Sequence, residues 1–281
     1  MFKTLIDCKT LARNLENLNW VIVDCRYDLM DEAAGERFWL ESHVPGAVYA
    51  SVSKELSGDP VTDCGRHPMP SPEAMAETFS KLGIDSSKQV VVYDDMGGAF
   101  CARLWWMLRY MQHDAVAILD GGWSRWQQEQ RVTESGVVKN RAVTFKGQAE
   151  SDRLVVIDQL AEESQLVDSR DPDRYQGKLE PIDRAAGHIP GAINHFWKNN
   201  LDEEGSFLEP EILAENFNQL FDQAAEDGSS AQTVFYCGSG VTACHNIFAS
   251  VHAGLAEPKL YGGSWSEWSS DPNRPVATGE R

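Results

Sequence analysis

The sequence predicts an α/β protein made of two tandem domains, each with a mostly parallel central sheet and helices on both faces. Two observations carry this prediction. Short apolar strands alternate along the chain with stretches of helical periodicity, a pattern typical of parallel sheets. The second half of the chain also repeats the first half, segment by segment and in the same order.

The repeat consists of four pairs of matching segments. The members of each pair lie 141 to 145 residues apart, which is too long for a solenoid unit, so we infer the duplication of a whole domain. A polar stretch with little periodicity separates the copies and sets the expected boundaries: a domain at 1–140, a linker at 141–153 and a domain at 154–281. The paired segments are 21–26 with 166–170, 43–47 with 188–192, 91–94 with 234–237, and 120–123 with 261–264.

Individual elements can be placed within each copy. Residues 72–82 are predicted to form a helix with Ser71 as its N-cap, and residues 102–111 are predicted to form another. Residues 233–236 are apolar and β-favouring, which indicates a buried strand. Ligands of parallel sheets bind at the carboxyl ends of the strands, so the residues that follow 236 are candidates for a site.

The segment Cys237-Gly238-Ser239-Gly240-Val241-Thr242-Ala243 follows that strand directly and leads into a predicted helix. Two glycines allow the loop to curl with its backbone N–H groups pointing inward, and the start of the helix adds further N–H groups and a partial positive charge. A thiol held in such a ring is favoured as the nucleophilic thiolate. We therefore interpret Cys237 as reactive; the alternative is a buried structural cysteine.

The first copy has Asp94 and Asp95 where the second has Cys237 and Gly238. It has no sulfur nucleophile at this position, and two carboxylates there would repel an anion. Cys101 matches Cys244 on the equivalent helix, so we expect both to be core positions. The first domain is therefore predicted to be non-catalytic and to form one side of a cleft, and the catalytic residues are expected in the second domain.

Composition restricts the partners. The net charge of −18 disfavours nucleic acid and anionic membrane surfaces. No run of 18 apolar residues occurs and no secretory apolar region follows Met1, so we expect no membrane span and a cytoplasmic location. Six cysteines show neither metal-ligand spacing nor a disulfide framework, which favours reduced thiols and no bound metal.

On these residues the chain resembles the tandem rhodanese-like sulfurtransferases, a family whose members use thiosulfate or 3-mercaptopyruvate as sulfur donor. The resemblance covers essentially the whole chain. It implies that Cys237 attacks a small anionic sulfur donor and holds a persulfide, which a thiol, a thioredoxin-like protein or cyanide then accepts. It also implies that no metal or organic cofactor takes part.

The resemblance implies roles for further residues. Arg174 matches the family arginine that binds the substrate carboxylate, with a surface ion pair as the alternative. Arg184 stands a residue or two away from the position of a second family arginine. His43 resembles a family histidine that is brought from the first domain towards Ser239, although its twin His188 indicates a scaffold role. The remaining candidates are residues of the loop. Ser239 could protonate the leaving group and Thr242 could donate a hydrogen bond to the persulfide, or either side chain could instead cap the helix. The substrate would also contact Gly238, Gly240 and Val241.

The loop favours one donor over the other. The loop of the thiosulfate type has basic residues where this chain has Gly238 and Ser239, and cationic side chains would help to hold a dianion such as thiosulfate. Mercaptopyruvate carries one fixed charge and needs less. We therefore expect mercaptopyruvate, with thiosulfate as the alternative donor, and a carrier that takes up sulfur without turnover as a further possibility.

A cysteine-dependent phosphatase is a different class of enzyme with the same domain. Its loop has an arginine six positions after the cysteine, where the guanidinium clamps the phosphate. This chain has Ala243 at that position, and its loop is one residue shorter than that family requires. The sequence therefore predicts a sulfurtransferase.

Overall fold

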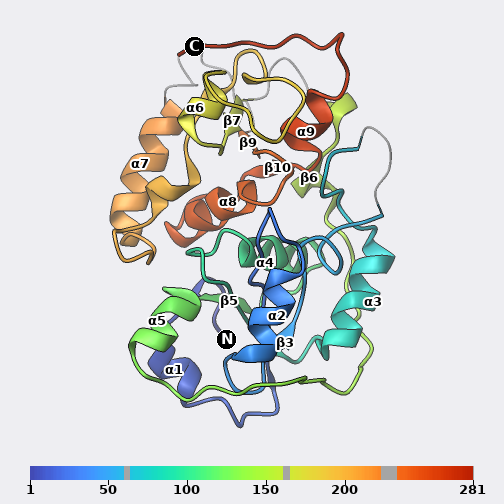
Figure 1. Ribbon diagram of the computed structural model, residues 1–281, viewed down its shortest axis with the longest axis vertical. Coiled ribbons are helices and arrows are strands. Elements are labelled where there is room, and N and C mark those ends of the chain that lie inside the picture. Colours follow the sequence, from blue (N-terminus) through green and yellow to red (C-terminus); the bar gives the residue numbers. More distant parts are fainter. Residues whose placement is uncertain (60–63, 161–164, 223–232, 281) are drawn as a thin grey trace. The chain divides into compact units, whose positions relative to one another are not determined.

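The computed structural model describes residues 1–59, 64–160, 165–222 and 233–280 (Figure 1). The chain divides into two compact units. Unit 1 consists of Met1–Gly58, Pro70–Glu150 and Leu201–Phe207, and unit 2 consists of Asp59–Met69, Ser151–Asn200 and Leu208–Arg281. Unit 1 thus gives way to unit 2 after Glu150, inside the segment expected to be a linker.

Two short segments belong to the opposite unit from the one that the sequence repeat predicts for them. In unit 1, Leu201–Phe207 is held by the N–H of Phe207, which donates to Asp120 Oδ1 at 3.1 Å, and by Ser206 Oγ, which accepts from Arg125 Nη2 at 3.0 Å. In unit 2, Asp59–Met69 brings residues from the first half of the sequence into the unit that contains Cys237.

Unit 1 is built on a five-stranded sheet with the strand order β1-β5-β4-β2-β3, and every described strand pair in it is parallel. The central strand β4 is buried along its whole length, as expected for a parallel sheet covered on both faces. The strands are β1 Leu5–Ile6, β2 Trp20–Asp24, β3 Val48–Tyr49, β4 Gln89–Tyr93 and β5 Val116–Leu119.

Helices surround this sheet. One core cluster joins Val91 and Tyr93 of β4 to Leu11 of α1 and to Trp123 and Trp126 of α5, and Figure 1 shows these two helices side by side. The alternate β4 residues face the other way, and α4 contacts β4 and β5. The helices of unit 1 are α1 Cys8–Ala12, α2 Ala34–Glu41, α3 Pro72–Leu82, α4 Cys101–Tyr110 and α5 Gly122–Gln128.

Unit 2 repeats the same topology, with a five-stranded sheet of order β6-β10-β9-β7-β8 and parallel pairing throughout its described strands. Its core joins Val234 and Tyr236 of β9 to Tyr261 and Trp265. The strands are β6 Leu154–Val155, β7 Gln165–Asp168, β8 Ile193–Asn194, β9 Thr233–Tyr236 and β10 Lys259–Tyr261; the helices are α6 Pro172–Tyr175, α7 Pro210–Asp222, α8 Ala243–His252 and α9 Ser264–Trp268; short 3-10 turns are η1 Ser151–Arg153, η2 Ile157–Gln159 and η3 Trp197–Asn200.

The predicted fold class is confirmed: two α/β domains of the same topology, each with a parallel sheet and helices around it. The predicted helix at 72–82 has the expected bounds, and Ser71 Oγ caps it by accepting from the N–H of Ala74 at 3.2 Å. The helix expected at 102–111 begins and ends one residue earlier. The strand at 233–236 is observed as β9.

One part of the internal alignment is wrong by one residue. The N–H of Trp123 donates to the carbonyl of Asp94 at 2.8 Å, and the N–H of Trp265 donates to the carbonyl of Cys237 at 3.0 Å. Trp123 therefore corresponds to Trp265 and not to Ser264. The repeated glycines misled the alignment, because Gly122 and Ser264 share the same left-handed backbone, with φ of 52° and 56°.

In the described part of the chain no helix combines the length and the apolar character that a membrane span requires.

Candidate active site

The loop that carries Cys237 connects the end of β9 to the start of α8 at Ala243. The segment after β10 fixes it from one side. Ser264 Oγ accepts from the N–H of Cys237 at 3.1 Å, and the N–H of Ser266 donates to the carbonyl of Gly238 at 2.9 Å. Gly240 has a φ of 74°, a left-handed conformation that favours glycine and lets the loop turn into the helix.

Ser264 is a serine in a conformation that favours glycine. It is fully buried, and its hydroxyl donates to the carbonyl of Tyr261 at 2.9 Å while it accepts from Cys237. A left-handed non-glycine residue costs roughly 1 to 3 kcal/mol and persists only where its surroundings hold it. The two hydrogen bonds of its side chain provide that hold, so Ser264 positions the backbone of Cys237.

The surroundings of Cys237 are polar and charged, although the residue is only 2% exposed. The guanidinium groups of Arg66 and Arg174 stand beside Gly238: a methyl group on Gly238 would lie 3.0 Å from Arg66 Nη2 and 3.7 Å from Arg174 Nη1. Burial, followed by the charge of Arg174, lowers the pKa of Arg66, and the neighbouring Cys237 acts in the opposite direction. An anionic sulfur at Cys237 would be attracted to Arg66.

The equivalent loop of unit 1 contains an anion of its own. Asp94 occupies the position of Cys237, and its carboxylate accepts from four backbone N–H groups at 2.8 to 2.9 Å. Their donors are Met96, Gly98, Phe100 and Cys101. Such a ring of amides is an anion-binding arrangement. The carboxylate of Asp94 fills this arrangement in unit 1, which explains in physical terms why that loop would not accept a second anion.

Arg174 is held by two buried carboxylates. Its Nη2 donates to Glu180 Oε1 at 2.7 Å and to Asp183 Oδ2 at 2.9 Å, and its Nε donates to Glu180 Oε2 at 3.1 Å. The side chains of Glu180 and Asp183 are 4% and 3% exposed. The ion pair that the sequence offered as the alternative role is thus present, but it orients Arg174 beside Gly238 and does not lie on the open surface.

The repeated Asp-x-Arg segments are scaffold. Asp168 and Arg170 form a buried pair with a closest contact of 2.6 Å, and Arg170 lies 4.7 Å from the ring centre of Trp265. Asp24 and Arg26 make the same pair in unit 1, and Arg26 packs in the same way on Trp123. Because unit 1 keeps this arrangement although Asp94 stands at the position of Cys237, the pair serves the fold.

The histidine that reaches Ser239 is His67 and not His43, which corrects the sequence expectation. Nδ1 of His67 lies 2.8 Å from Ser239 Oγ, and both residues are buried. His67 comes from the Asp59–Met69 segment of unit 2. No periodicity or repeat in the sequence pointed to it; its only signal was the Gly-Arg-His-Pro stretch before the predicted helix at residue 72.

His43 serves the fold of unit 1. It is fully buried, and its Nδ1 lies 2.6 Å from the carbonyl oxygen of Trp39. Its twin His188 makes the same contact in unit 2, 2.8 Å from the carbonyl oxygen of Tyr175. The shared role explains why the histidine is repeated in both halves.

Arg184 also differs from the expectation. It is exposed, and its Nη1 donates to the carbonyl of Ser270 at 2.9 Å. The second guanidinium at the loop is supplied by Arg66, which the sequence did not indicate. The backbone N–H of Arg66 donates to Ser266 Oγ at 3.1 Å, so Arg66 is tied to the same segment that fixes the Cys237 loop.

Two further loop residues have less defined contacts. Thr242 is the N-cap residue of α8 but makes no capping hydrogen bond with its side chain, so the capping alternative does not account for it. Val241 is buried, and its carbonyl accepts from the N–H of Cys244 at 3.1 Å.

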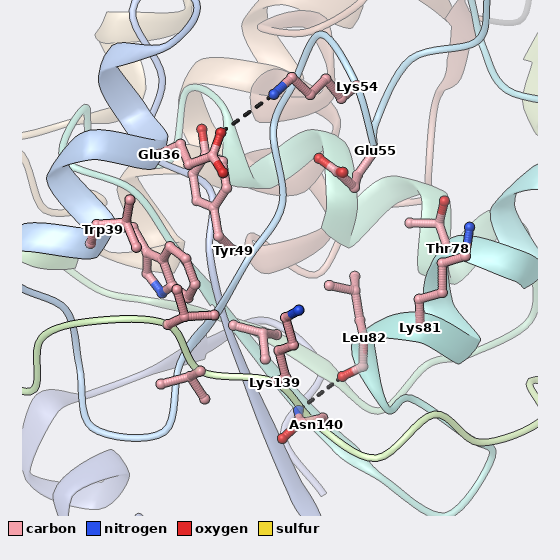
Figure 2. A pocket seen from close by; sticks show the side chains of 14 residues that line it. Glu36, Trp39, Tyr49, Lys54, Glu55, Thr78, Lys81, Leu82, Lys139 and Asn140 are labelled. Carbon is pink, nitrogen blue, oxygen red and sulfur yellow. Dashed lines mark hydrogen bonds and ion pairs between the residues drawn. The ribbon is translucent and has the colours of Figure 1, made fainter.

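Unit 1 has a cavity of its own, with a volume of about 820 Å³. Figure 2 shows one ion pair and one hydrogen bond among the residues that line it: Lys54 pairs with Glu36 at 3.4 Å, and Asn140 Nδ2 donates to the carbonyl of Leu82 at 2.9 Å. The residues that line it include none of the predicted site residues. The candidate site is therefore the Cys237 loop of unit 2 and not this cavity.

The fold and the loop define a class of protein, and comparison with known proteins gives the same class. The chain belongs to the rhodanese-like domain family, whose model matches residues 7–129 and 155–271. The predicted tandem rhodanese-like organisation is thereby confirmed.

Individual relatives are similar over almost the full chain. A Pseudomonas aeruginosa protein named "Probable 3-mercaptopyruvate sulfurtransferase" is 42% identical over 286 residues, which cover 98% of each chain. SseB of Mycobacterium tuberculosis, provisionally named a thiosulfate sulfurtransferase, is 40% identical over 264 residues, 92% of this chain and 90% of its own. The solved structure of 3-mercaptopyruvate sulfurtransferase from Leishmania major matches with a TM-score of 0.81 and 31% identity, over 95% of this chain and 74% of its own.

Proposed function

We propose that this protein is a sulfurtransferase that moves a sulfur atom from 3-mercaptopyruvate to a thiol or to cyanide through a persulfide on Cys237. The observation that carries this proposal is the position of Cys237 at the carboxyl end of a central strand, with two guanidinium groups beside the next residue. The names of the Pseudomonas and Leishmania relatives support the choice of donor.

In the first step the Cys237 thiolate attacks the sulfur of mercaptopyruvate. A sulfur–sulfur bond forms and the sulfur–carbon bond breaks, with its electron pair passing into the enolate of pyruvate. The proton that was on the donor thiol ends on the methyl carbon of pyruvate, so Cys237 is left as an anionic persulfide. Ser239, hydrogen-bonded to His67, is placed to relay this proton.

In the second step the acceptor takes the outer sulfur. A thiolate or cyanide attacks that sulfur, the sulfur–sulfur bond breaks, and the electron pair returns to Cys237 as the starting thiolate. The backbone amides of the loop are suited to stabilise the anionic persulfide, since the matching loop of unit 1 binds the Asp94 carboxylate through four such groups. Thr242 remains a candidate donor to the persulfide.

Thiosulfate is the second candidate donor, and two observations support it as an alternative to mercaptopyruvate. SseB is provisionally named for thiosulfate. The sequence argument against thiosulfate also relied on a loop without basic residues, whereas Arg66 brings a guanidinium to Gly238 from a segment distant in the sequence. In that case Cys237 attacks the outer sulfur of thiosulfate and sulfite leaves.

A phosphatase role lacks its phosphate clamp. Ala243, at the position of the phosphatase arginine, is the first residue of α8 and is fully buried. A carrier role would use the same persulfide but would take up sulfur only once for each molecule of protein.

Steady-state release of pyruvate from mercaptopyruvate, with cyanide as acceptor, tests the proposal. We expect many turnovers for each protein molecule. Cys237→Ser should lower the rate at least about a thousandfold, because a hydroxyl is a far weaker nucleophile at neutral pH. Cys101→Ser is the matched control and should keep the rate, since burial beside Asp94 raises the pKa of Cys101 well above its ordinary value and keeps this thiol inert. A single uptake of sulfur without turnover would favour the carrier, and an active Cys237→Ser variant would end the assignment.

A further inference from the structure

A buried polar network in unit 2 joins α8 to the end of β7, and the proposed mechanism does not use it. Its centre is Asn246, in the first turn of α8. Nδ2 of Asn246 donates to Ser169 Oγ at 2.9 Å and to the carbonyl of His195 at 2.8 Å. Oδ1 of Asn246 accepts from Asn200 Nδ2 at 2.6 Å. Both polar atoms of this buried amide are thereby bonded, as burial requires. The Asn246 network, as we call it, consists of Ser169, His195, Asn200, His245 and Asn246, all of them buried.

Ser169 connects the two ends of the Cys237 loop. Its backbone N–H donates at 2.8 Å to the carbonyl of Tyr236, the residue before Cys237. Its hydroxyl accepts from Asn246, in the helix that follows the loop. The two bonds of Ser169 therefore close a ring around the whole segment 237–245 and limit the distance that this segment can span.

Asn200 supports the same helix from the turn η3. Its Nδ2 lies 3.3 Å from Nδ1 of His245, and its Oδ1 accepts from Nε2 of His195 at 3.1 Å. An amide nitrogen can only donate, so Nδ1 of His245 is the acceptor. The backbone N–H of His245 donates to the carbonyl of Thr242 at 3.2 Å, so this support extends to the end of the loop.

Unit 1 has the same fold but different side chains at these positions. Shared backbone hydrogen bonds and helix positions identify four counterparts: Cys25 for Ser169, Ala50 for His195, Ala102 for His245 and Arg103 for Asn246. The alanine side chains cannot form hydrogen bonds, and Arg103 Nε donates to the carbonyl of Leu56 at 3.2 Å. The Asn246 network is therefore not a requirement of the shared fold and accompanies the loop that contains Cys237.

The two loops differ in what holds them. The carboxylate of Asp94 accepts from four N–H groups of its own loop, so the loop of unit 1 is fixed from inside. Sulfur is a weak hydrogen-bond acceptor, so Cys237 cannot replace this carboxylate as an internal support. Amides that were already occupied could not receive a further anion. A loop that must receive an anionic sulfur therefore needs support from outside, which the Asn246 network provides.

We propose that Asn246 is a positioning residue for sulfur transfer, which acts with Ser169 and Asn200 to hold the Cys237 loop in the shape that receives the anionic persulfide. This inference rests on the proposed function and deepens it. Asn246 acts through the backbone of the loop. Because the loop amides bind charge that arises on sulfur during the reaction, loosening the loop slows persulfide formation more than it weakens donor binding.

The test follows the burst of pyruvate when the protein is mixed with excess mercaptopyruvate and no acceptor. The burst amplitude counts the molecules that can take up a sulfur, and the rate constant measures persulfide formation. Asn246→Leu should lower the rate constant about 100-fold at unchanged amplitude, because a displacement of about 1 Å at the reacting groups has an effect of that size. The donor concentration that gives half of the maximal rate should change by less than about twofold.

Ser169→Ala is a milder variant that decides the question if Asn246→Leu does not fold. Asn246 keeps its bonds to His195 and Asn200, and only the link between the two ends of the loop is lost. Loss of one buried hydrogen bond should lower the rate constant about tenfold, again at unchanged amplitude.

Thr233→Val is the matched control. Thr233 Oγ1 donates to Gln165 Oε1 at 2.8 Å, a side-chain hydrogen bond between the same two strands, β7 and β9, at their amino ends. Its loss should leave both the burst amplitude and the rate constant unchanged, because this end of the strands is remote from the Cys237 loop.

The outcomes separate this inference from the function on which it rests. A wild-type protein that releases no pyruvate contradicts the proposed function itself. If the wild-type protein is active, a lower amplitude with an unchanged rate constant in the Asn246 and Ser169 variants would mean that the network only stabilises the fold, which overturns the inference. An unchanged rate constant in Ser169→Ala, or an equal loss in Thr233→Val, would overturn it as well.

Discussion

Adding a single methyl group at Gly238 tests the geometry beside Cys237. Gly238 has no left-handed backbone in this structure, so alanine can adopt its conformation without strain. Its methyl group would lie 3.0 Å from Arg66 Nη2 and 3.7 Å from Arg174 Nη1, and Arg66 would have to move by a few tenths of an ångström. Gly238→Ala should therefore disturb donor binding and leave the fold intact.

The magnitude follows from what is displaced. The side chain of Arg66 is 31% exposed and can move, so we expect the weakening and not the complete loss of one charged hydrogen bond to the donor. That corresponds to about a tenfold increase in KM for mercaptopyruvate. The free energy of unfolding should change by less than about 0.5 kcal/mol, as for most substitutions without strain or a buried cavity.

Gly262→Ala is the matched control. Gly262 also lies in unit 2 with an ordinary backbone, and a methyl group there would lie 3.1 Å from Leu154 Cδ1, a similarly close contact with an apolar side chain. Steady-state kinetics should show the tenfold effect in Gly238→Ala alone. Equal KM values in Gly238→Ala and the wild-type protein would refute the reasoning that the two arginines face the donor at Gly238.

Three further predictions concern single residues. In His67→Gln the amide can still bond to Ser239, but it cannot take up or release a proton. The kcat for pyruvate release should therefore fall about a hundredfold, and the dependence of kcat on pH should become flatter. An unchanged kcat would contradict the proposed proton relay. Ser264→Ala should lower the free energy of unfolding by about 2 kcal/mol in denaturant titrations, because the hydrogen bonds of the hydroxyl are lost. Ser264→Gly should lower it by less, because glycine tolerates the φ of 56°. A larger loss of stability in Ser264→Gly than in Ser264→Ala would contradict this reasoning. Burial and the neighbouring Asp94 raise the pKa of Asp95 from 3.8 to about 6, so the folded protein binds the proton more tightly and its stability falls as the pH rises between these values. Asp95→Asn should therefore raise the free energy of unfolding of unit 1 by about 1 to 2 kcal/mol at pH 7, after allowance for the partial exposure of Asp95, and should not change it below about pH 4. An equal gain at both pH values would contradict this prediction.

Most of the fold was predictable because its signals are local. The helix at 72–82 has its N-cap serine, a proline in its first turn and a glycine after its last residue, and each of these acts within one turn of helix. The strand at 233–236 and the loop after it are adjacent in the sequence, so a nucleophile at the carboxyl end of a strand could be read directly.

The rest of the site depends on contacts that are remote in the sequence. His67 and Ser239 are 172 residues apart, and the segment that contains Arg66 and His67 has neither periodicity nor a counterpart in the other half. A repeat identifies what both halves share, which is scaffold; His43 was therefore a poor guide to the site. The role of Asp94 was also only partly predictable, because the sequence shows its charge but not the four amides that bind it.

The sulfur on Cys237 is the centre of the proposed mechanism, and mass spectrometry can observe it directly. We expect the protein treated with mercaptopyruvate in the absence of an acceptor to gain the mass of one sulfur atom, located on the peptide that contains Cys237 and removed by cyanide. Cys237→Ser should gain nothing, and Cys101→Ser should gain the same mass as the wild-type protein. Pyruvate release without added sulfur on Cys237, or added sulfur on another cysteine, would contradict the mechanism.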